Sequence, residues 1–402
     1  MATFKIKAKD KQGKLISEVL EAETQKDLID TLHRRGLVVM GIEEQRSVRK
    51  SKSHRRLRVK ADELVIFSRQ LATMVNAGLP LIEGLRTLYE QIENDNFRQV
   101  IAGVINQVEG GSAFADAITR YPGVFGAFFV NMVRAGEASG KLSEILDRVA
   151  DHLESVSSLK RKIKMAMMYP AVVSIMSGLI TLVLFLKVIP IFEDIYVDFD
   201  AALPLPTQVL IMLSKCFRQY FILITIIAVI GFFLLARYKK TERGKRMHDR
   251  LMFKLPVFGN LFKKVAISRF ASTLSTLTAS GVPILRAFEI VKEVSGNKMV
   301  EEAVASAGDR IQEGKSIEEP LRQSGIFPPL VTKMISVGEK SGRLDDMLRK
   351  ISIYYDEQVT AVVAGLTSII EPLLIAFLGI VVGGIVLAMF LPIFRLSAIV
   401  AQ

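Results

Sequence analysis

The sequence is poor in the residues that build redox and metal centres. It contains one cysteine, Cys216, so it can form no intramolecular disulfide and no cysteine-based metal site. Its four histidines are scattered and lack the close spacing of zinc ligands: His33, His54, His152 and His248. We therefore expect no zinc site, and no cofactor is predicted.

A phosphate loop for nucleotide binding is also missing. Such a loop needs a glycine, four residues and then Gly-Lys-Ser or Gly-Lys-Thr, placed between a strand and a helix. The nearest approach begins at Gly308 and has five residues before Gly314, in a stretch whose pattern predicts helices. No other catalytic motif supports an enzyme, so the sequence predicts a protein without enzymatic activity.

The N-terminus lacks the apolar stretch of a signal peptide. Basic residues occur at Lys5 and Lys7, but no apolar run follows them. The chain before the first long apolar window, about residues 1–165, is therefore expected to stay in the cytoplasm.

What the sequence does contain is apolar segments long enough to cross a bilayer. Its mean hydropathy of +0.33 is high for a soluble protein. Three windows without charge are close to the ~20 residues that a spanning helix needs: 165–186, 219–236 and 372–394. Buried helices of a soluble core are the alternative, but a core helix of this length normally keeps a polar face. We predict three transmembrane helices, at 165–189, 219–236 and 371–394.

Charges beside these windows predict how the chain crosses the membrane. Basic residues cluster before the first window and after the second, whereas the segment between them is acidic. Because basic flanks stay in the cytoplasm, we expect a cytoplasmic N-terminus, a short acidic periplasmic loop at 190–218 and a periplasmic tail at 395–402. The net charge of +12 comes largely from membrane-proximal clusters and one linker, so membrane lipids are expected partners.

The cytoplasmic part is predicted to contain a small module, a linker and two larger units. Residues 1–45 combine short alternating strands with a helix near 24–35, which predicts a miniature α+β fold. Residues 46–60 form a basic linker; nucleic-acid binding is the alternative there, but no aromatic residues interleave with the charges. The rest should form two helical bundles and a basic segment that precedes the second: 61–164, 267–370 and 237–266.

A seven-residue motif occurs twice and organises the chain. Residues 136–142 read Gly-Glu-Ala-Ser-Gly-Lys-Leu, and residues 338–344 read Gly-Glu-Lys-Ser-Gly-Arg-Leu. Other pairs keep the same separation of 202 residues, such as Phe125 with Phe327. At this length the repeat indicates a duplicated domain and not a solenoid.

Most of the motif is explained by a turn between two helices. Its first glycine can end one helix and its serine can cap the next. The residues concerned are Gly136, Ser139, Gly140 and Leu142 in one copy and Gly338, Ser341, Gly342 and Leu344 in the other. The turn does not require a carboxylate, yet both copies carry one, at Glu137 and Glu339. An architectural role is the favoured interpretation of the motif, and the glutamates are candidates for binding a partner.

The first copy also offers a candidate site for a divalent cation, built from Glu137, Glu144, Asp147 and Asp151. Asp147 and Asp151 are four residues apart and share a helix face, and such cations prefer oxygen ligands. Exposed acidic residues on helices are commoner than metal ligands. We therefore expect a solvated acidic face there.

Together these features resemble the inner-membrane platform proteins of type II secretion systems and type IV pilus machines, the type II secretion F family. The resemblance rests on the repeated motif, on Gly-x-Pro corners at 78–80 and 281–283, and on Pro-Ile-Phe at 190–192 and 392–394. It covers nearly the whole chain. It implies a mainly α, multi-pass protein of the bacterial inner membrane, with two cytoplasmic helical bundles, three transmembrane helices and a small N-terminal α+β module.

The resemblance also implies a function. Such a protein is a scaffold that couples a cytoplasmic hexameric assembly ATPase to the insertion of pilin or pseudopilin subunits into a growing fibre. The implied partners are that ATPase, pilin or pseudopilin transmembrane helices, other inner-membrane assembly components and further copies of the chain, without nucleic acid. The motifs do not separate the secretion branch from the pilus branch. A membrane transporter or permease subunit is the competing function, but it would require more spans and mid-membrane charges.

Overall fold

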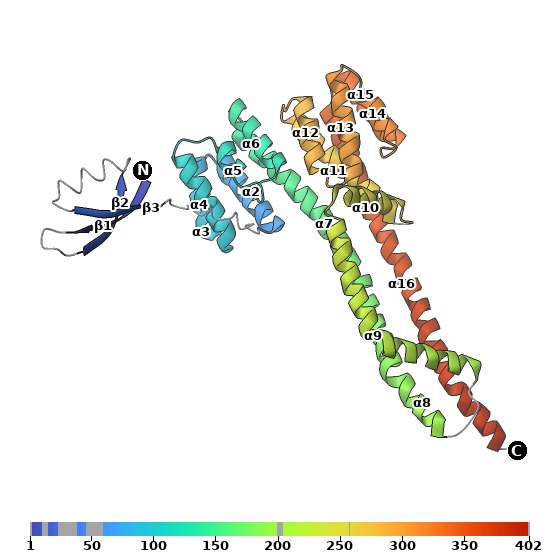
Figure 1. Ribbon diagram of the computed structural model, residues 1–402. Helices are drawn as coiled ribbons and strands as arrows, with labels where there is room; N and C mark the ends of the chain where they lie inside the picture. Colours follow the sequence, from blue (N-terminus) through green and yellow to red (C-terminus); the bar gives the residue numbers. More distant parts are fainter. Residues whose placement is uncertain are drawn as a thin grey trace. The chain divides into compact units, whose positions relative to one another are not determined.

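The structure is a computed structural model that describes residues 2–9, 15–22, 38–45, 59–198, 204–256 and 258–400. It divides into two units, Met1–Arg58 and Val59–Gln402 (Figure 1). Each unit is described by itself.

The first unit contains an antiparallel sheet of three strands in the order β2-β1-β3. The strands are β1 (Ala2–Lys9), β2 (Leu15–Ala22) and β3 (Val38–Gln45). In the register, Phe4 is opposite Leu20 of β2 and Glu44 of β3. The strands lie where alternating sequence predicted extended chain, whereas the helix predicted near 24–35 lies outside the described residues.

The second unit is helical and contains the duplicated sequence twice. The first copy comprises α2 (Ala61–Asn76), α3 (Leu81–Gln91), α4 (Asp95–Glu109), α5 (Phe114–Thr119), α6 (Ala127–Ser139) and α7 (Leu142–Val183). The second comprises α11 (Phe258–Ala279), α12 (Ile284–Val294), α13 (Lys298–Gln312), α14 (Glu318–Gln323), α15 (Pro329–Ser341) and α16 (Leu344–Val400). Between them lie a π-helical turn η1 (Leu184–Val188), α8 (Ile189–Asp198), α9 (Leu205–Tyr238) and α10 (Glu242–Lys254).

The first corner of each bundle has the same construction. Gly78, after α2, has a φ of 89°, and Gly281, after α11, has a φ of 76°. Glycine adopts this left-handed conformation readily because it has no Cβ. Pro80 and Pro283 then stand directly before α3 and α12, where a fixed φ suits the start of a helix. The two predicted Gly-x-Pro corners are confirmed.

Each bundle has its own apolar core, and the two cores repeat an aromatic pair. The ring centroids of Phe67 and Phe125 are 6.4 Å apart in the first bundle, and those of Phe270 and Phe327 are 4.8 Å apart in the second. All four side chains are buried. Burying one such side chain contributes about 1.5–3 kcal/mol. In both copies the first helix packs against the last, α2 on α7 and α11 on α16.

The two bundles contact each other. Helix α12 packs on α6, where the Arg286 guanidinium donates to the Asn131 side-chain oxygen at 3.2 and 3.1 Å. Helix α7 packs on α11, where Nδ1 of His152 lies 3.1 Å from the Ser272 hydroxyl. The duplication therefore produces two cores that share an interface.

Three helical segments of the described chain are long and apolar enough to cross a membrane: Leu142–Ile195, Leu205–Tyr238 and Leu344–Pro392. Large apolar side chains on them are exposed, including Val172 (54%), Phe232 (74%) and Ile380 (75%). A soluble protein rarely leaves so much apolar surface in water. Helices α7 and α16 each extend from a bundle as one long helix (Figure 1).

The far ends of these helices pack together, and the loop predicted at 190–218 is mostly helical. Helix α8 continues to Asp198 and α9 begins at Leu205. Pro190 does not end the helical run, which continues from α7 through the π-helical turn η1 into α8. Likewise α16 continues to Val400, into the predicted tail. The buried cluster that joins these ends consists of Ile189, Ile211, Ile385 and Met389.

Candidate functional site

The repeated motif forms the corner between α6 and α7 and, in the second copy, between α15 and α16. Gly140 and Gly342 have the left-handed backbone conformation, each with a φ of 69°. The backbone N–H after each of them donates to the carbonyl of Gly136 at 3.0 Å and of Gly338 at 2.9 Å. This is the usual glycine closure of a helix C-terminus. The prediction that Gly136 and Gly338 end the helices is wrong, because the second glycine of the motif does so.

Gly136 and Gly338 instead allow two helices to approach closely. Both are buried inside their helices. A Cβ at position 136 would lie 3.0 Å from Cβ of Ile145, and one at position 338 would lie 2.9 Å from Cα of Leu344. Any larger residue at these positions would force the helices of the corner apart.

Ser139 and Ser341 were predicted to cap the following helices, and this is also wrong. The Ser139 hydroxyl donates to the Ala135 carbonyl at 2.8 Å, and the Ser341 hydroxyl donates to the Gly338 carbonyl at 3.4 Å. Both serines belong to the last turn of the preceding helix, so their hydroxyls meet the free carbonyls of that turn. Helices α7 and α16 begin at the motif leucines, Leu142 and Leu344.

The carboxylate of Glu137 caps a short helix of its own bundle. Its two oxygens accept hydrogen bonds from the backbone N–H groups of Phe114 at 2.6 Å and Ala115 at 2.9 Å, in the first turn of α5. These amides have no partner within the helix, and an anion is favourable at a helix N-terminus. Glu137 thus has a structural role that the turn alone does not reveal.

Glu339 repeats this arrangement at the start of α14. Its oxygens accept from the Ile317 N–H at 3.2 and 3.1 Å and from the Ser316 hydroxyl at 2.8 Å. Ile317 is the residue directly before α14. The same fold position in both copies therefore carries the same carboxylate-to-amide contact.

Replacement of Glu137 by alanine is expected to lower the free energy of unfolding by about 1–2 kcal/mol, because the first amides of α5 lose their acceptor. Denaturant unfolding of the full-length protein in detergent measures this. Glu144→Ala is the control, since Glu144 makes only an exposed pair with Arg148 four residues along α7, and we expect no measurable change. Equal effects of the two substitutions would contradict the capping role.

The four acids considered for a divalent cation do not converge. Asp147 and Asp151 both contact Arg69, Glu144 pairs with Arg148, and Glu137 caps α5. Within the ranges that the structure describes, no group of three or more His, Cys, Asp or Glu side chains is arranged to hold a metal ion. The acidic face of α7 is used for ion pairs.

Arg69 on α2 is the centre of these ion pairs, and the sequence analysis did not identify it. Its guanidinium contacts Asp147 at 2.8 Å, Glu154 at 2.7 Å and also Asp151. The hydrogen bonds to Glu154 and Asp151 raise the pKa of Arg69, and the Arg69 hydrogen bond lowers the pKa of Glu154. The sequence did contain a signal for this cluster, because the spacing of Asp147, Asp151 and Glu154 places all three acids on one face of α7. These ion pairs connect α2 to α7.

Two family models match the chain. The model described as type II secretion system (T2SS), protein F, matches residues 67–190 and again residues 270–392. The model described as type II secretion system protein F, N-terminal domain, matches residues 1–43. The repeated match coincides with the two copies of the helical bundle.

Curated proteins of similar length align over most of the chain. The type IV pilus assembly protein PilC of Thermus thermophilus is 42% identical over 402 residues, which is 98% of each chain. PilC of Myxococcus xanthus is 42% identical over 341 residues, covering 84% of this chain and 81% of its own. The type II secretion system protein F of Vibrio cholerae is 32% identical over 407 residues, with full coverage of both.

Proposed function

The chain belongs to the type II secretion system protein F family and is a platform protein of a type IV pilus or type II secretion machine, and we propose that it serves the pilus branch. Two relatives named for pilus assembly share 42% of its residues. Two relatives named for secretion share 32% and 33% over comparable lengths. The sequence motifs are common to both branches, so this difference in identity is what supports the choice.

Within that machine, the proposed role is a scaffold, without enzymatic activity, that couples a cytoplasmic assembly ATPase to the insertion of pilin subunits. One observation carries this proposal. Each cytoplasmic bundle is joined to the membrane-crossing part by one continuous helix, α7 with 42 residues and α16 with 57 residues. Force applied to a bundle would thus reach helices that contact pilins in the bilayer. Pilin helices, other assembly components and further copies of the chain are the proposed partners.

The family and three helices of the described chain that are long and apolar enough to span a bilayer indicate an inner-membrane protein, and we propose a specific topology for it. The N-terminus and both bundles lie in the cytoplasm and the C-terminus lies in the periplasm. Basic residues before the first span and after the second support this orientation. The N-terminal unit is proposed to be an α+β module that completes its three-stranded sheet with a helix.

We further propose that the motif corners contact the ATPase. Gly140 and Gly342 are each followed by an exposed basic residue, Lys141 and Arg343, so both corners present positive charge to the solvent. Arg343 is 73% exposed and its only ion pair among the described residues is a long one, 3.4 Å, to Asp346. These side chains are therefore available to a partner, whereas the neighbouring carboxylates of Glu137 and Glu339 are used by the bundles themselves.

The test uses a strain that lacks the gene and is complemented with variants. Wild type should restore surface pili and co-purify with the ATPase. Lys141→Glu with Arg343→Glu should reduce both about tenfold or more, as expected when several charge contacts of about 1 kcal/mol each are reversed, while insertion and thermal stability stay normal. Glu137→Ala with Glu339→Ala should weaken association indirectly, because the motif corners lose their contacts to the starts of α5 and α14, while the protein still inserts.

The control reverses another exposed, repeated basic pair: Arg120, which directly follows α5, and Arg322, which lies in α14 and pairs with Glu319. This variant should keep the wild-type number of pili. Normal piliation and ATPase co-purification of the Lys141 and Arg343 variant would contradict the proposed contact. If wild type restores protein secretion and no pili, the protein serves the secretion branch.

A further inference from the structure

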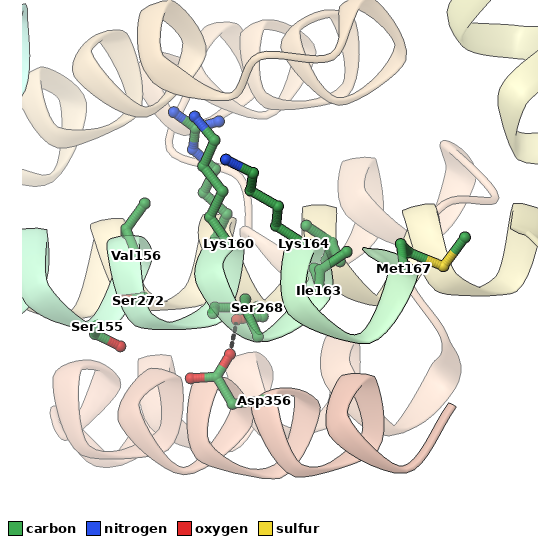
Figure 2. Close-up of a pocket in the computed structure, with 12 residues that line it drawn as sticks. Ser155, Val156, Lys160, Ile163, Lys164, Met167, Ser268, Ser272 and Asp356 are labelled. Atoms are coloured by element: carbon green, nitrogen blue, oxygen red, sulfur yellow. Dashed lines mark hydrogen bonds between the residues drawn. The ribbon is translucent and has the colours of Figure 1, made fainter. Parts of the chain in front are cut away.

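A cavity of about 450 Å³ opens where the bundles meet the membrane-crossing helices (Figure 2). Its lining residues come from α7 of the first copy and from α11 and α16 of the second. Sites for small molecules commonly have volumes of about 300–1,000 Å³. The duplicated halves build this cavity together, and neither half forms it alone.

Three cations line the cavity: Lys160 and Lys164 on α7, and Arg269 on α11. One carboxylate, Asp356 on α16, also lines it and accepts a hydrogen bond from the Ser268 hydroxyl. Figure 2 shows Lys160 and Lys164 projecting from α7 on the side away from Asp356. No ion pair joins any of the three cations to an acidic side chain of the described residues. The cavity therefore carries an excess of positive charge.

Arg269 makes no ion pair with an acidic side chain of the described residues. Its side chain is exposed toward the cavity, and its guanidinium is so close to the turn after α12 that a Cβ at Gly296 would lie 2.9 Å from it. The surrounding atoms remove water from the guanidinium and lower the pKa of Arg269. A charge that has lost water gains from a nearby opposite charge. The position of Arg269 therefore favours an anion in the cavity.

The cavity also has an apolar wall, which extends along α7 to the first apolar segment. Leu159, Ile163 and Val265 line it and pack on a buried apolar cluster between α7, α11 and α16. Met167 also lines it and belongs to the first apolar segment. The cavity thus combines three cations with an apolar wall that reaches the first apolar segment at Met167.

We propose that this cavity binds an anionic phospholipid. The phosphate would contact Lys160, Lys164 and Arg269, and the acyl chains would follow the apolar wall to the first membrane-crossing segment. A soluble phosphate compound matches the cations but leaves the apolar wall in water, whereas an amphiphile matches both. A basic pocket beside membrane helices on the cytoplasmic side is a general form of lipid-headgroup site. The lipid would touch both copies of the duplicated unit and hold them together, independently of any ATPase.

The sequence contains no tryptophan, which permits a direct test with one fluorescent reporter. Met167→Trp places that reporter on the apolar wall of the full-length protein in phosphatidylcholine vesicles. Brominated phosphatidylglycerol should quench it at a mole fraction about tenfold or more below that of brominated phosphatidylcholine, since each nearby cation is worth about a factor of five toward anionic lipid. Lys160→Gln with Lys164→Gln and Arg269→Gln should abolish this preference.

The matched control removes three other cations near the membrane, Arg237, Lys239 and Lys240 at the end of α9, which are exposed. Each is replaced by glutamine, and the preference for the anionic lipid should remain. Equal quenching by the two lipids, or equal loss in both triple variants, would overturn the site. Inorganic phosphate in the buffer should leave quenching unchanged; if it removes the preference, the ligand is a soluble phosphate and not a lipid.

A second measurement covers the case in which the reporter disturbs folding. Native mass spectrometry of the otherwise unmodified protein, purified in detergent with added phosphatidylglycerol, should show a retained lipid adduct. The triple variant at the cavity should lose that adduct, and the triple variant at α9 should keep it. Identical adducts in all three proteins would reject the proposal.

Discussion

Replacement of Gly338 by valine is expected to lower the free energy of unfolding by about 1–3 kcal/mol, the usual cost of overpacking a filled core. A Cβ at this position would lie 2.9 Å from the backbone Cα of Leu344 and 3.1 Å from Cβ of Met347. Because a backbone atom cannot rotate out of the way, α15 and α16 must separate. Denaturant unfolding of the full-length protein in detergent measures the loss.

Gly365, on α16, is the control for close approach at Gly338 of α15. A Cβ there meets no atom within 4 Å, so Gly365→Ala should leave stability unchanged or raise it through better helix propensity, by up to about 1 kcal/mol. Gly136→Val should have a smaller effect than Gly338→Val, since its nearest neighbour is the side chain of Ile145. If Gly338→Val is as stable as the wild type, close helix approach is not the reason for this glycine.

Acidification is expected to destabilise the protein through His152. Its imidazole is buried between the bundles, with its ring centroid 4.2 Å from that of Phe128. Burial, and secondarily the charge of Arg269, lowers the pKa of His152 to about 4. In the unfolded chain the group titrates near pH ~6.5. Between pH ~6.5 and pH ~4 the histidine is protonated in the unfolded state and neutral in the folded state. The free energy of unfolding therefore falls as the pH falls through this range, by about 3 kcal/mol in total.

His152→Asn isolates this contribution, because the amide can keep a hydrogen bond to Ser272 and does not titrate. We expect the wild type to lose more stability than the variant between pH 7 and pH 4.5, with the difference appearing below pH ~6.5. Acidic residues titrate in both proteins, so the difference between the two unfolding curves reports His152. Parallel curves would mean that the imidazole keeps its ordinary affinity for a proton in the folded state.

The features that the sequence predicted correctly are encoded locally. The apolar windows depend only on composition along the chain, and the corners at Gly78 and Gly281 depend on a glycine and a proline two residues apart. Such signals do not require any knowledge of which segments meet in space.

The features that were missed depend on distant partners or on small differences between neighbouring residues. Glu137 appeared unexplained because the amides that it binds, at Phe114 and Ala115, are 23 and 22 residues away. Gly136 and Gly140 both can end a helix, and the choice between them is made by the packing of Ile145 against Gly136. The cavity joins Lys164, Arg269 and Asp356 from three helices, and no local pattern connects them.

The unbroken course of α16 has a mechanical consequence. Its 57 residues make a rod of about 85 Å at 1.5 Å per residue, with one end at the motif corner of the second bundle. Such a rod is a lever: a tilt of about 5° around one end displaces the other by about 7 Å at this length. Ile385 and Met389 on α16 share a buried cluster with Ile189 of α8 and Ile211 of α9, so the far end of α16 cannot move alone. A tilt of α16 that moved this end, if Pro372 and Pro392 within the helix did not bend, would therefore have to displace α8 and the start of α9 with it.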